Sequence, residues 1–403
     1  MTAIRVYLDT ENGPVVVGTA HIRRLRGVTT TQFTYDDSYL AGPGWAVSPD
    51  LALIHRESIT DGLPGALDDS APDTWGRNLI TRRLASQARC AGHAAPAPTE
   101  VNYLLGVNDL ARQGALRFSD ADDSRFLAES GEMPKLLHLD TLLEATRQVT
   151  QDDRDAHEAV KTLLDAGSGS LGGARPKASV TDGDRLFIAK FPHRDDRWDV
   201  MRWEGVALDL AADCGLATPP HEVITVGGEP VLLVERFDRQ GHIRIPFLSA
   251  RSLINLRDDT GSDYLELVEG VTEHGSAVIG DLVEVWRRIA FSIAINNTDD
   301  HMRNHAFLRE HNGWKLSPIF DVNPNPDATA PRSTSISGAT LSEDCRAALF
   351  ASADRFNLDP TEAKRHWNEI IEVVTSWRDV ASNHGIPGSA QERFSAALDQ
   401  WSA

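Results

Sequence analysis

The alternation of apolar and polar positions divides the chain into a strand-rich beginning and a helix-rich end. Runs at 4–8, 15–22 and 31–36 alternate β-branched or aromatic residues with polar ones, and this pattern predicts strands. Over much of 239–403 apolar residues instead recur every three or four positions, which is typical of helices packed on a core. The stretch 282–297 is the longest such run. A β-rich part therefore precedes a helical part.

Several helices are expected between these two parts. Helical spacing over 68–87 predicts a helix that Ser70 or Asp73 can cap. Two acidic amphipathic segments follow, at 136–149 and 156–164.

Two hairpins are also expected. The run 180–191 predicts one with its turn at Asp182–Gly183, and 221–237 predicts another around a Gly-Gly pair. A strongly amphipathic helix over 198–215 should separate them, with Gly215 ending it.

This order predicts an α+β protein with two lobes, a β-rich small lobe and a helical large lobe, separated by a cleft. The expected division is an N-terminal β-rich subdomain at 1–110, a small lobe at 111–238 and a large lobe at 239–403.

Charge and cysteine content argue against several classes of protein and site. The chain has 403 residues and a formal charge of -19, from 59 acidic and 40 basic residues, so wide DNA binding by this chain alone is not expected. The three cysteines, Cys90, Cys214 and Cys345, lie far apart, which argues against a disulfide framework or a thiolate zinc site. With no apolar signal core at the N-terminus and no membrane-spanning run, we expect a cytoplasmic protein without membrane contact.

The stretch "NNTDDHMRNHAFL", 296–308, concentrates the candidate chemistry. Asp299 and Asn304 lie five residues apart after a helix, and a following hairpin with its turn at Asn312–Gly313 should return Asp321 to the same region. Phosphoryl transfer needs one carboxylate to accept the hydroxyl proton, plus an amide and a second carboxylate to hold magnesium. We therefore predict Asp299 as the base and Asn304 and Asp321 as ligands of Mg²⁺. Helix caps and turns are the alternative for such residues taken singly.

His301 and His305 show the spacing of a helical zinc site, but position 302 is Met where a metalloprotease needs Glu. The segment also runs into a predicted strand, which would separate the two rings. A structural role, in which His301 hydrogen-bonds the loop, is favoured over a metal hydrolase, and His301 is also predicted among the nucleotide-binding residues.

A glycine-rich loop, "GSGSLGGARPK" at 167–177, could offer backbone N–H groups to phosphates, although a flexible linker is the alternative. Lys190 ends an apolar strand, and Glu204 lies on the following helix, as in the Lys–Glu pair of kinases; a solvated position is the alternative for Glu204. The connector 232–238 could bind adenine through its backbone. Its Arg236 and Asp238 could equally form a surface ion pair.

Taken together, these motifs resemble the HipA family of serine/threonine toxin kinases from bacterial toxin–antitoxin pairs. The similarity extends over nearly the whole chain and includes "SLGGARPKASV", "IAKF", "VERFD", "NTDDHMRNHAFL" and "SPIFDV" in order. It implies a protein-kinase-like fold, ATP and Mg²⁺ as cofactors, and a role for each matching residue. Asp299 would be the catalytic aspartate, and the magnesium ligands would be Asn304 and Asp321. The phosphates would be contacted by Gly172, Gly173, Ala174, Arg175, Pro176, Lys177 and Lys190, and adenine by the hinge residues Glu235, Arg236 and Phe237. The autophosphorylated serine would be Ser170, with Ser168 as its alternative.

The resemblance also implies partners. Family members phosphorylate a translation factor, glutamyl-tRNA synthetase being the known type of target, so an aminoacyl-tRNA synthetase is the expected substrate. A small HipB-like helix-turn-helix antitoxin neutralises them and carries most of the DNA contact. Asp300, which is Gly in some relatives, is expected to be a tolerated surface change. A catalytically inactive kinase-like protein that binds ATP or the antitoxin is the alternative function.

Overall fold

The N-terminal runs form an antiparallel sheet. β1 (Thr2–Leu8), β2 (Val15–Leu25) and β3 (Val28–Tyr35) pair in sequence, which confirms the three predicted strands. β4 (Ser58–Asp61) and β5 (Leu116–Asp120) form the edges, in the order β4-β3-β2-β1-β5. Alternate residues of each long strand are buried, so one face of the sheet packs on the core.

The computed structural model describes residues 2–42, 44–120, 126, 133–151, 156–170, 173–257, 261–310 and 312–401. The chain folds into two units. Unit 1 comprises Met1–Arg194 and Thr225–Leu248, and unit 2 comprises Asp195–Ile224 and Ser249–Ala403.

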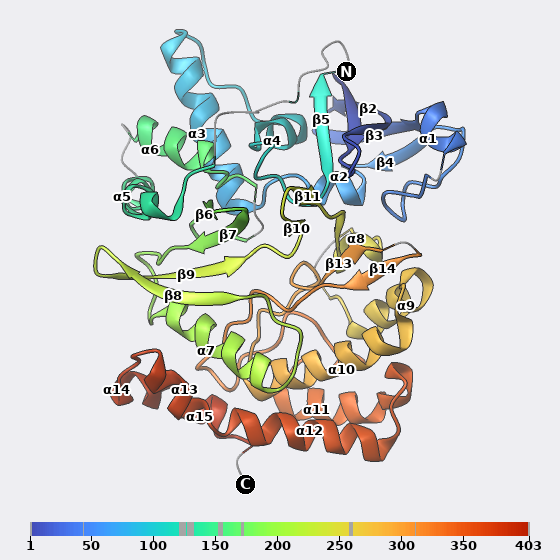
Figure 1. The fold of residues 1–403 in the computed structure, drawn as a ribbon. Coiled ribbons are helices and arrows are strands. Elements are labelled where there is room, and N and C mark those ends of the chain that lie inside the picture. Colours follow the sequence, from blue (N-terminus) through green and yellow to red (C-terminus); the bar gives the residue numbers. More distant parts are fainter. Residues whose placement is uncertain are drawn as a thin grey trace. The chain divides into compact units, whose positions relative to one another are not determined.

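Helices surround the strands of unit 1. The helix expected over 68–87 is α3, and it begins after Asp73, whose carboxylate accepts a hydrogen bond from the Thr74 N–H. The other candidate cap, Ser70, donates to the carbonyl of Ala66 instead. α5 and α6, the two acidic amphipathic segments, lie side by side (Figure 1), and α6 also packs on α3. The helices of this unit are α1 (Asp37–Ala41), α2 (Gly65–Asp69), α3 (Thr74–Cys90), α4 (Glu100–Gly106), the 3₁₀ turn η1 (Leu136–His138), α5 (Leu139–Thr150) and α6 (His157–Asp165).

A second sheet has the order β6-β7-β9-β8. Both predicted hairpins are confirmed, but Asp182 pairs with Arg185, so the first turn lies one residue later than predicted, at Gly183–Asp184. Gly183 has φ +59°, a value that favours glycine. The strands are β6 (Lys177–Asp182), β7 (Arg185–Lys190), β8 (His221–Val226) and β9 (Glu229–Glu235), followed by the short pair β10 (Arg239–Gln240) and β11 (Ile243–Arg244).

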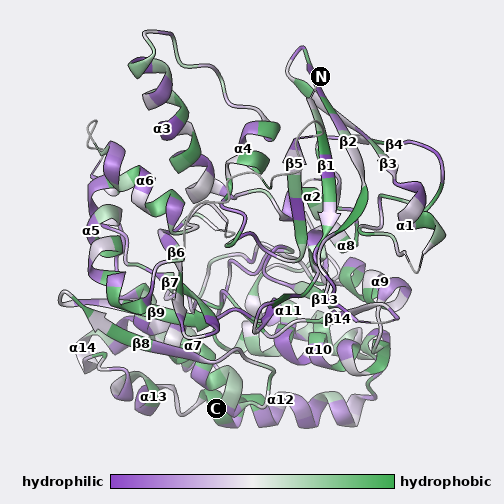
Figure 2. Ribbon diagram, turned by 45° about the horizontal axis from the view of Figure 1, so that its top comes forward, coloured by the Kyte–Doolittle hydropathy of each residue, from purple (hydrophilic) through white to green (hydrophobic). Residues whose placement is uncertain are grey.

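Unit 2 is mostly helical. α7 (Val200–Asp213) buries Trp203, whose ring stacks on Phe394 at a centroid distance of 3.8 Å and lies 5.9 Å from the ring of Trp377. α10 contacts α11 and α12, and in Figure 2 α12 carries both hydrophobic and hydrophilic residues, as a surface helix should. The helices are α8 (Ala250–Leu253), α9 (Tyr264–His274), α10 (Val278–Ala294), α11 (Ser342–Ala351), η2 (Ala353–Phe356), α12 (Pro360–Val374), α13 (Trp377–Asn383), α14 (Gly388–Gln391), η3 (Glu392–Phe394) and α15 (Ser395–Leu398).

A small sheet accompanies these helices. β13 (Ala306–Arg309) and β14 (Trp314–Leu316) form the hairpin predicted after the polar stretch, and β12 (Phe247–Ser249) pairs with β13. The Glu310 N–H donates to the Gly313 carbonyl at 2.9 Å, so Gly313 is a paired residue and the prediction of the turn at Asn312–Gly313 is wrong by one residue.

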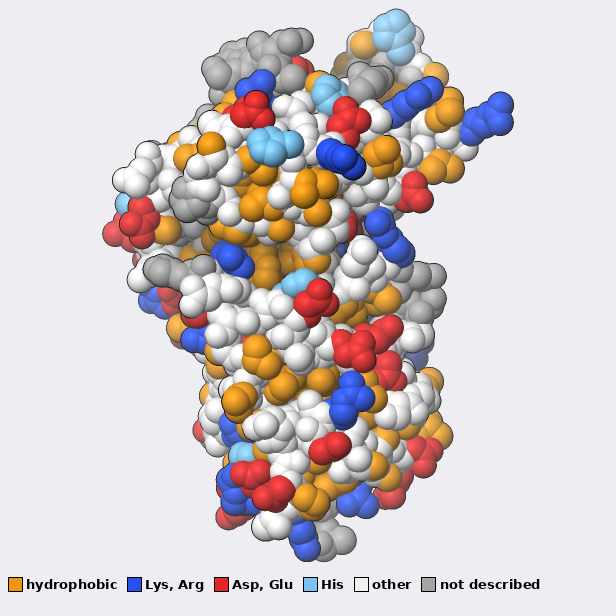
Figure 3. Space-filling model, turned by 90° about the vertical axis from the view of Figure 1, so that its right-hand side faces the viewer, with side chains coloured by type: hydrophobic (Ala, Val, Ile, Leu, Met, Phe, Trp, Pro, Cys, Tyr) orange, Lys and Arg blue, Asp and Glu red, His pale blue; other side chains and the backbone are white. Residues whose placement is uncertain are grey.

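The surface matches the acidic composition. On the face that Figure 3 shows, basic side chains lie singly among acidic ones and form no continuous basic surface. In the part of the chain that the structure describes, no helix is both long and apolar enough to cross a bilayer.

Candidate active site

The polar stretch 296–308 forms a tight loop between α10 and β13. Asn296 leaves the helix with φ +53°, and its side-chain amide donates to the carbonyls of Asn325 and Asp327, at 2.7 and 2.9 Å. The Asn325 amide in turn donates to the Thr298 hydroxyl at 2.8 Å. These bonds fasten the loop to the segment that follows Asp321, which explains why so many polar residues are concentrated here.

The loop brings Asp299 and Asn304 together. The Nδ2 of Asn304 donates to the backbone carbonyl of Asp299 at 3.0 Å, and the Asn304 N–H donates to the His301 carbonyl at 2.8 Å. Asn304 is buried, with 7% of its surface exposed. Because Nδ2 is held by the loop, the amide orientation is fixed, and Oδ1 is the atom left to act as a cation ligand.

The segment that leads to Asp321 is held by helix α10. The Asp281 carboxylate of this helix accepts from the Leu316 N–H at 3.1 Å, and Arg288 donates to the Ser317 carbonyl at 2.7 Å. Beyond β14, the Ile319 N–H donates to the Ala217 carbonyl at 2.7 Å. Asp321 itself has φ +56°, a conformation that is costly for a residue other than glycine. Strain of this kind is typical of functional positions.

The carboxylates of Asp299 and Asp321 influence each other. The Asp299 side chain is open to solvent, but protein atoms around it partly desolvate the carboxylate, and this raises its pKa; the negative charge of Asp321 raises it further. His301 and the Ser333 hydroxyl, 3.4 Å from Oδ1, act in the opposite direction.

This oxygen-rich set fits a divalent cation of the magnesium type. A carboxylate and an amide oxygen are ligands of the kind that Mg²⁺ prefers, so Asp321 and Asn304 fit this ion, and a bound cation would offset the repulsion by which Asp321 contributes to the raised pKa of Asp299. The structure thus places three of the predicted residues, Asp299, Asn304 and Asp321, in one site of unit 2.

Asp300 has a different role from the one its spacing suggested. It is buried, accepts a short hydrogen bond from the Tyr264 hydroxyl, and forms an ion pair with His305, with 3.0 Å between Oδ1 and Nε2. Burial alone would raise the pKa of Asp300, but His305 and the Tyr264 hydroxyl hold it well below the usual range. The prediction that Asp300 is a tolerated surface position is therefore wrong.

The two histidines do not share a ligand position. His305 is committed to Asp300, and its ring lies edge-on to Tyr264 at 5.7 Å. His301 accompanies Asp299, to whose carbonyl its backbone N–H donates at 3.1 Å. Within the described residues, no group of three His, Cys, Asp or Glu side chains could hold a metal ion. The geometry gives a zinc hydrolase no support.

In unit 1, the glycine-rich loop meets the start of α3. Gly172 lies outside the described residues. Gly173 has φ +96°, and its N–H donates to the Asp73 carboxylate at 2.8 Å. Farther back, a Cβ on Gly76 would stand 2.8 Å from the Cα of Gly169, so helix and loop are in direct contact. At its described residues, Gly169 and Gly173, the loop is packed against α3, which the flexible-linker alternative does not explain.

Two lysines meet at the end of this loop. Lys177 and Lys190 are cross-strand partners on β6 and β7, and both are buried, at 4% and 7% exposure. The Lys177 ammonium also lies 2.5 Å from the position that a Cβ on Gly173 would take. Two buried ammonium groups beside a glycine loop form a cationic site whose chemistry fits a triphosphate. Ala174, Arg175 and Pro176 complete the loop.

The two candidate serines are buried in this conformation. Ser168 donates to the Lys177 carbonyl, which ties it to the start of β6. The Ser170 hydroxyl is buried and makes no hydrogen bond among the described residues. Neither hydroxyl is accessible unless the loop moves.

The connector after β9 is more firmly held than the sequence suggested. The Arg236 N–H donates to the Leu186 carbonyl of β7 at 2.8 Å. The Glu235 carbonyl belongs to the same peptide group as this N–H, and the two ends of a trans peptide group point in opposite directions. The carbonyl of Glu235 therefore faces away from β7, as a hinge contact to adenine would require. Arg236 and Asp238 are 4% and 2% exposed, so the alternative of a surface ion pair is wrong.

Glu204 is also buried, at 1% exposure on α7, which excludes the solvated alternative. It belongs to unit 2 and Lys190 to unit 1, so their pairing stays a prediction. Sequence reasoning missed Ser333, which contacts Asp299, and Tyr264, which holds Asp300. Neither residue belongs to a recognisable motif, because each reaches the loop only through the tertiary fold.

Comparison with known proteins defines the class and then the family. The chain has a mixed α+β fold, as predicted from its sequence. A family model for the HipA-like C-terminal domain matches residues 169–377, and one for the HipA N-terminal domain matches 14–94. The chain belongs to the HipA family.

Individual relatives agree with this assignment. "Toxin YjjJ" of Escherichia coli (strain K12) is 24% identical over 344 residues, which cover 82% of this chain and 72% of that protein. A Haemophilus influenzae protein named "Putative kinase" is 24% identical over 187 residues, 39% of this chain and 54% of that one. The HipA chain in a complex of Shewanella oneidensis HipA, HipB and operator DNA superposes with a TM-score of 0.66 at 15% identity, covering 99% of this chain and 97% of that chain, which shows a shared fold.

Proposed function

We propose that the chain is an ATP- and Mg²⁺-dependent serine/threonine protein kinase that acts as the toxin of a toxin–antitoxin pair. The observation that carries the proposal is the cluster of Asp299, Asn304 and Asp321, in which an accessible carboxylate of raised pKa adjoins two oxygen ligands.

The residues divide the work of phosphoryl transfer. Asp299 accepts the proton of the attacking hydroxyl, and its raised pKa makes it a better proton acceptor than an ordinary aspartate. Asn304 and Asp321 would hold magnesium, which when bound neutralises charge on the phosphates. Lys177 and Lys190, with the N–H groups of the glycine loop, would hold the phosphates, and the backbone from Glu235 to Phe237 the adenine.

Family membership supports further proposals about regulation and partners. Ser170, with Ser168 as the alternative, would be autophosphorylated, and the added charge of about -2 beside the phosphate site would silence the enzyme. A HipB-like helix-turn-helix antitoxin would bind the chain and supply most of the DNA contact. An aminoacyl-tRNA synthetase is the expected protein substrate.

The test is transfer of the γ-phosphate from labelled ATP with Mg²⁺. Wild-type chain should label itself and a protein in a cell extract, while Asp299→Ala should lose at least about a hundredfold in rate, the usual contribution of a general base. Equal labelling by the variant would refute the assigned base. ATP binding by wild type without any transfer would favour the inactive, binding-only alternative.

A further inference from the structure

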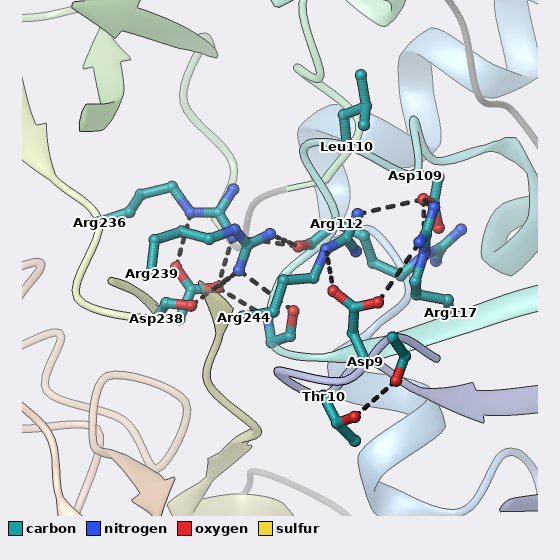
Figure 4. Close-up of polar contacts among 12 residues, drawn as sticks. Asp9, Thr10, Asp109, Leu110, Arg112, Arg117, Arg236, Asp238, Arg239 and Arg244 are labelled. Atoms are coloured by element: carbon teal, nitrogen blue, oxygen red, sulfur yellow. Dashed lines mark hydrogen bonds and ion pairs between the residues drawn. The ribbon is translucent and has the colours of Figure 1, made fainter. Parts of the chain in front are cut away.

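The backbone proposed to hold adenine continues directly into a buried group of charges. Arg236, Asp238 and Arg239, which we call the hinge cluster, have side chains only 2%, 3% and 8% exposed. The Asp238 carboxylate accepts from Arg236 at 2.9 and 2.6 Å and from Arg239 at 2.9 Å, and Figure 4 shows both guanidinium groups converging on it. Burial alone would raise the pKa of Asp238, but the two arginines hold it well below its usual range.

The hinge cluster is fastened to the segment between α4 and β5. Arg236 donates to the carbonyls of Ala111 and Arg112, at 2.5 and 3.3 Å. Arg239 donates to the carbonyls of Arg112 and Gly114, at 2.6 and 3.2 Å, and the Gly114 N–H donates to Asp238 at 2.7 Å. Every one of these contacts joins residues more than 120 positions apart in the sequence.

A second set of ion pairs extends the connection. Arg244 of β11 lies 3.2 Å from the Asp109 carboxylate and 3.7 Å from that of Asp9, the residue that follows β1. Arg117 of β5 contacts the same two carboxylates (Figure 4). The segment 109–117 is thus held by hydrogen bonds and ion pairs from two places in the chain, residues 236–239 and Arg244.

Such a buried network is a costly way to gain stability. Desolvation offsets most of the attraction between buried charges, and apolar residues of the same volume would stabilise the fold as well. Directional hydrogen bonds instead fix the position of a backbone segment, and here the fixed segment is the one that follows Glu235.

We propose that the hinge cluster positions the adenine-binding backbone, so that the N-terminal segment 109–117 determines how the base is held without contacting it. The inference rests on the proposed function. Its prediction is specific, because only the adenine contact should depend on the cluster, whereas phosphate binding depends on Lys177, Lys190 and the glycine loop.

The test measures binding of two probes, Mg·ATP and inorganic triphosphate, to the full chain by calorimetry. Arg236→Lys keeps the positive charge but cannot form the bidentate hydrogen bonds that the guanidinium group donates to the Asp238 carboxylate. We expect it to weaken ATP binding about tenfold and to leave triphosphate binding unchanged. Arg239→Gln, which leaves the Arg236–Asp238 pair intact, should weaken ATP binding in the same direction by a smaller factor.

The matched control is Arg185→Gln. Arg185 forms an ion pair with Glu235 at 2.6 Å, but its side chain is 53% exposed, so both affinities should stay at the wild-type value. Wild-type ATP affinity in Arg236→Lys, or equal loss of both probes, would overturn the inference, because equal loss indicates a general structural defect. Failure of the wild-type chain itself to bind ATP would instead overturn the proposed function.

Discussion

At the scale of single residues, the acidic groups of the 296–308 loop have opposite environments. Asp299 is accessible and lies near a like charge, whereas its neighbour Asp300 is buried and fully paired. One carboxylate is kept reactive, and the next fixes the loop that carries it. Both consequences can be measured.

Asp299→Asn should stabilise the protein while abolishing phosphate transfer. A raised pKa means that the folded state binds the proton more tightly than the unfolded chain does. The free energy of unfolding therefore falls as pH rises from the unfolded pKa to the folded pKa. At neutral pH the ionised Asp299 carboxylate thus destabilises the folded state. We expect a higher Tm at pH 7 for the variant and no change for Asp379→Asn, because Asp379 is an exposed residue of α13. A lower Tm would contradict the assigned environment. Wild-type kinase activity should also decline on the acid side at a higher pH than the usual aspartate value predicts.

Asp300→Ala should destabilise the fold by about 3 kcal/mol, because it leaves His305 and the Tyr264 hydroxyl buried without their acceptor. The lowered pKa of Asp300 adds a pH signature. Its contribution is complete above the unfolded value of about 3.9 and is lost as pH falls through the folded value. Chemical denaturation of wild type and variant at pH 7 and pH 3 measures both effects. Glu372→Ala, on the exposed face of α12, is the control and should change stability by less than about 0.5 kcal/mol.

At the scale of elements, turns and periodic segments could be predicted, but buried charges could not. The Gly-Gly pair specifies its hairpin locally, so that element follows from the sequence. The Asn312–Gly313 signal predicted its hairpin but placed the turn too late, because Gly313 pairs with Glu310. Arg236 and Asp238 are indistinguishable in sequence from a surface pair, because their burial depends on carbonyls of residues 111 and 112, far away in the chain. Likewise, motifs in the sequence point to candidate site residues, whose roles stay predictions, whereas no motif points to Ser333, which contacts Asp299 only through the tertiary fold.

The contact between α3 and the glycine loop leads to a prediction for Gly76→Ala. The new Cβ would lie 2.8 and 2.9 Å from the Cα and carbonyl oxygen of Gly169, so the backbone must shift, at a cost of about 1–3 kcal/mol. If the proposed autophosphorylation occurs, a loosened loop should also expose Ser170 and speed its modification, which mass spectrometry can follow. Gly280→Ala is the control, since its Cβ would meet nothing within 4 Å. Unchanged stability in Gly76→Ala would show that the loop does not depend on this contact.

At the scale of the whole molecule, charge distinguishes the chain from a DNA-binding protein. With a net charge of -19, the purified chain should not retard operator DNA at about 150 mM salt. Together with the proposed antitoxin it should do so, and a gel-shift titration of each protein separately and of the mixture measures this. Retardation by the chain alone, weakening steeply with salt, would contradict the expectation.

The ties between residues 109–117 and 236–244 also limit how this protein can be recombined. In a chimera that takes residues 1–117 from a distant homologue, Arg236, Arg239 and Arg244 would face a segment that does not place the carbonyls and carboxylates they bind in this chain. A chimera should therefore fold only when residues 109–117 and 236–244 come from the same parent. The two segments are accordingly expected to have coevolved, although more than a hundred codons separate them.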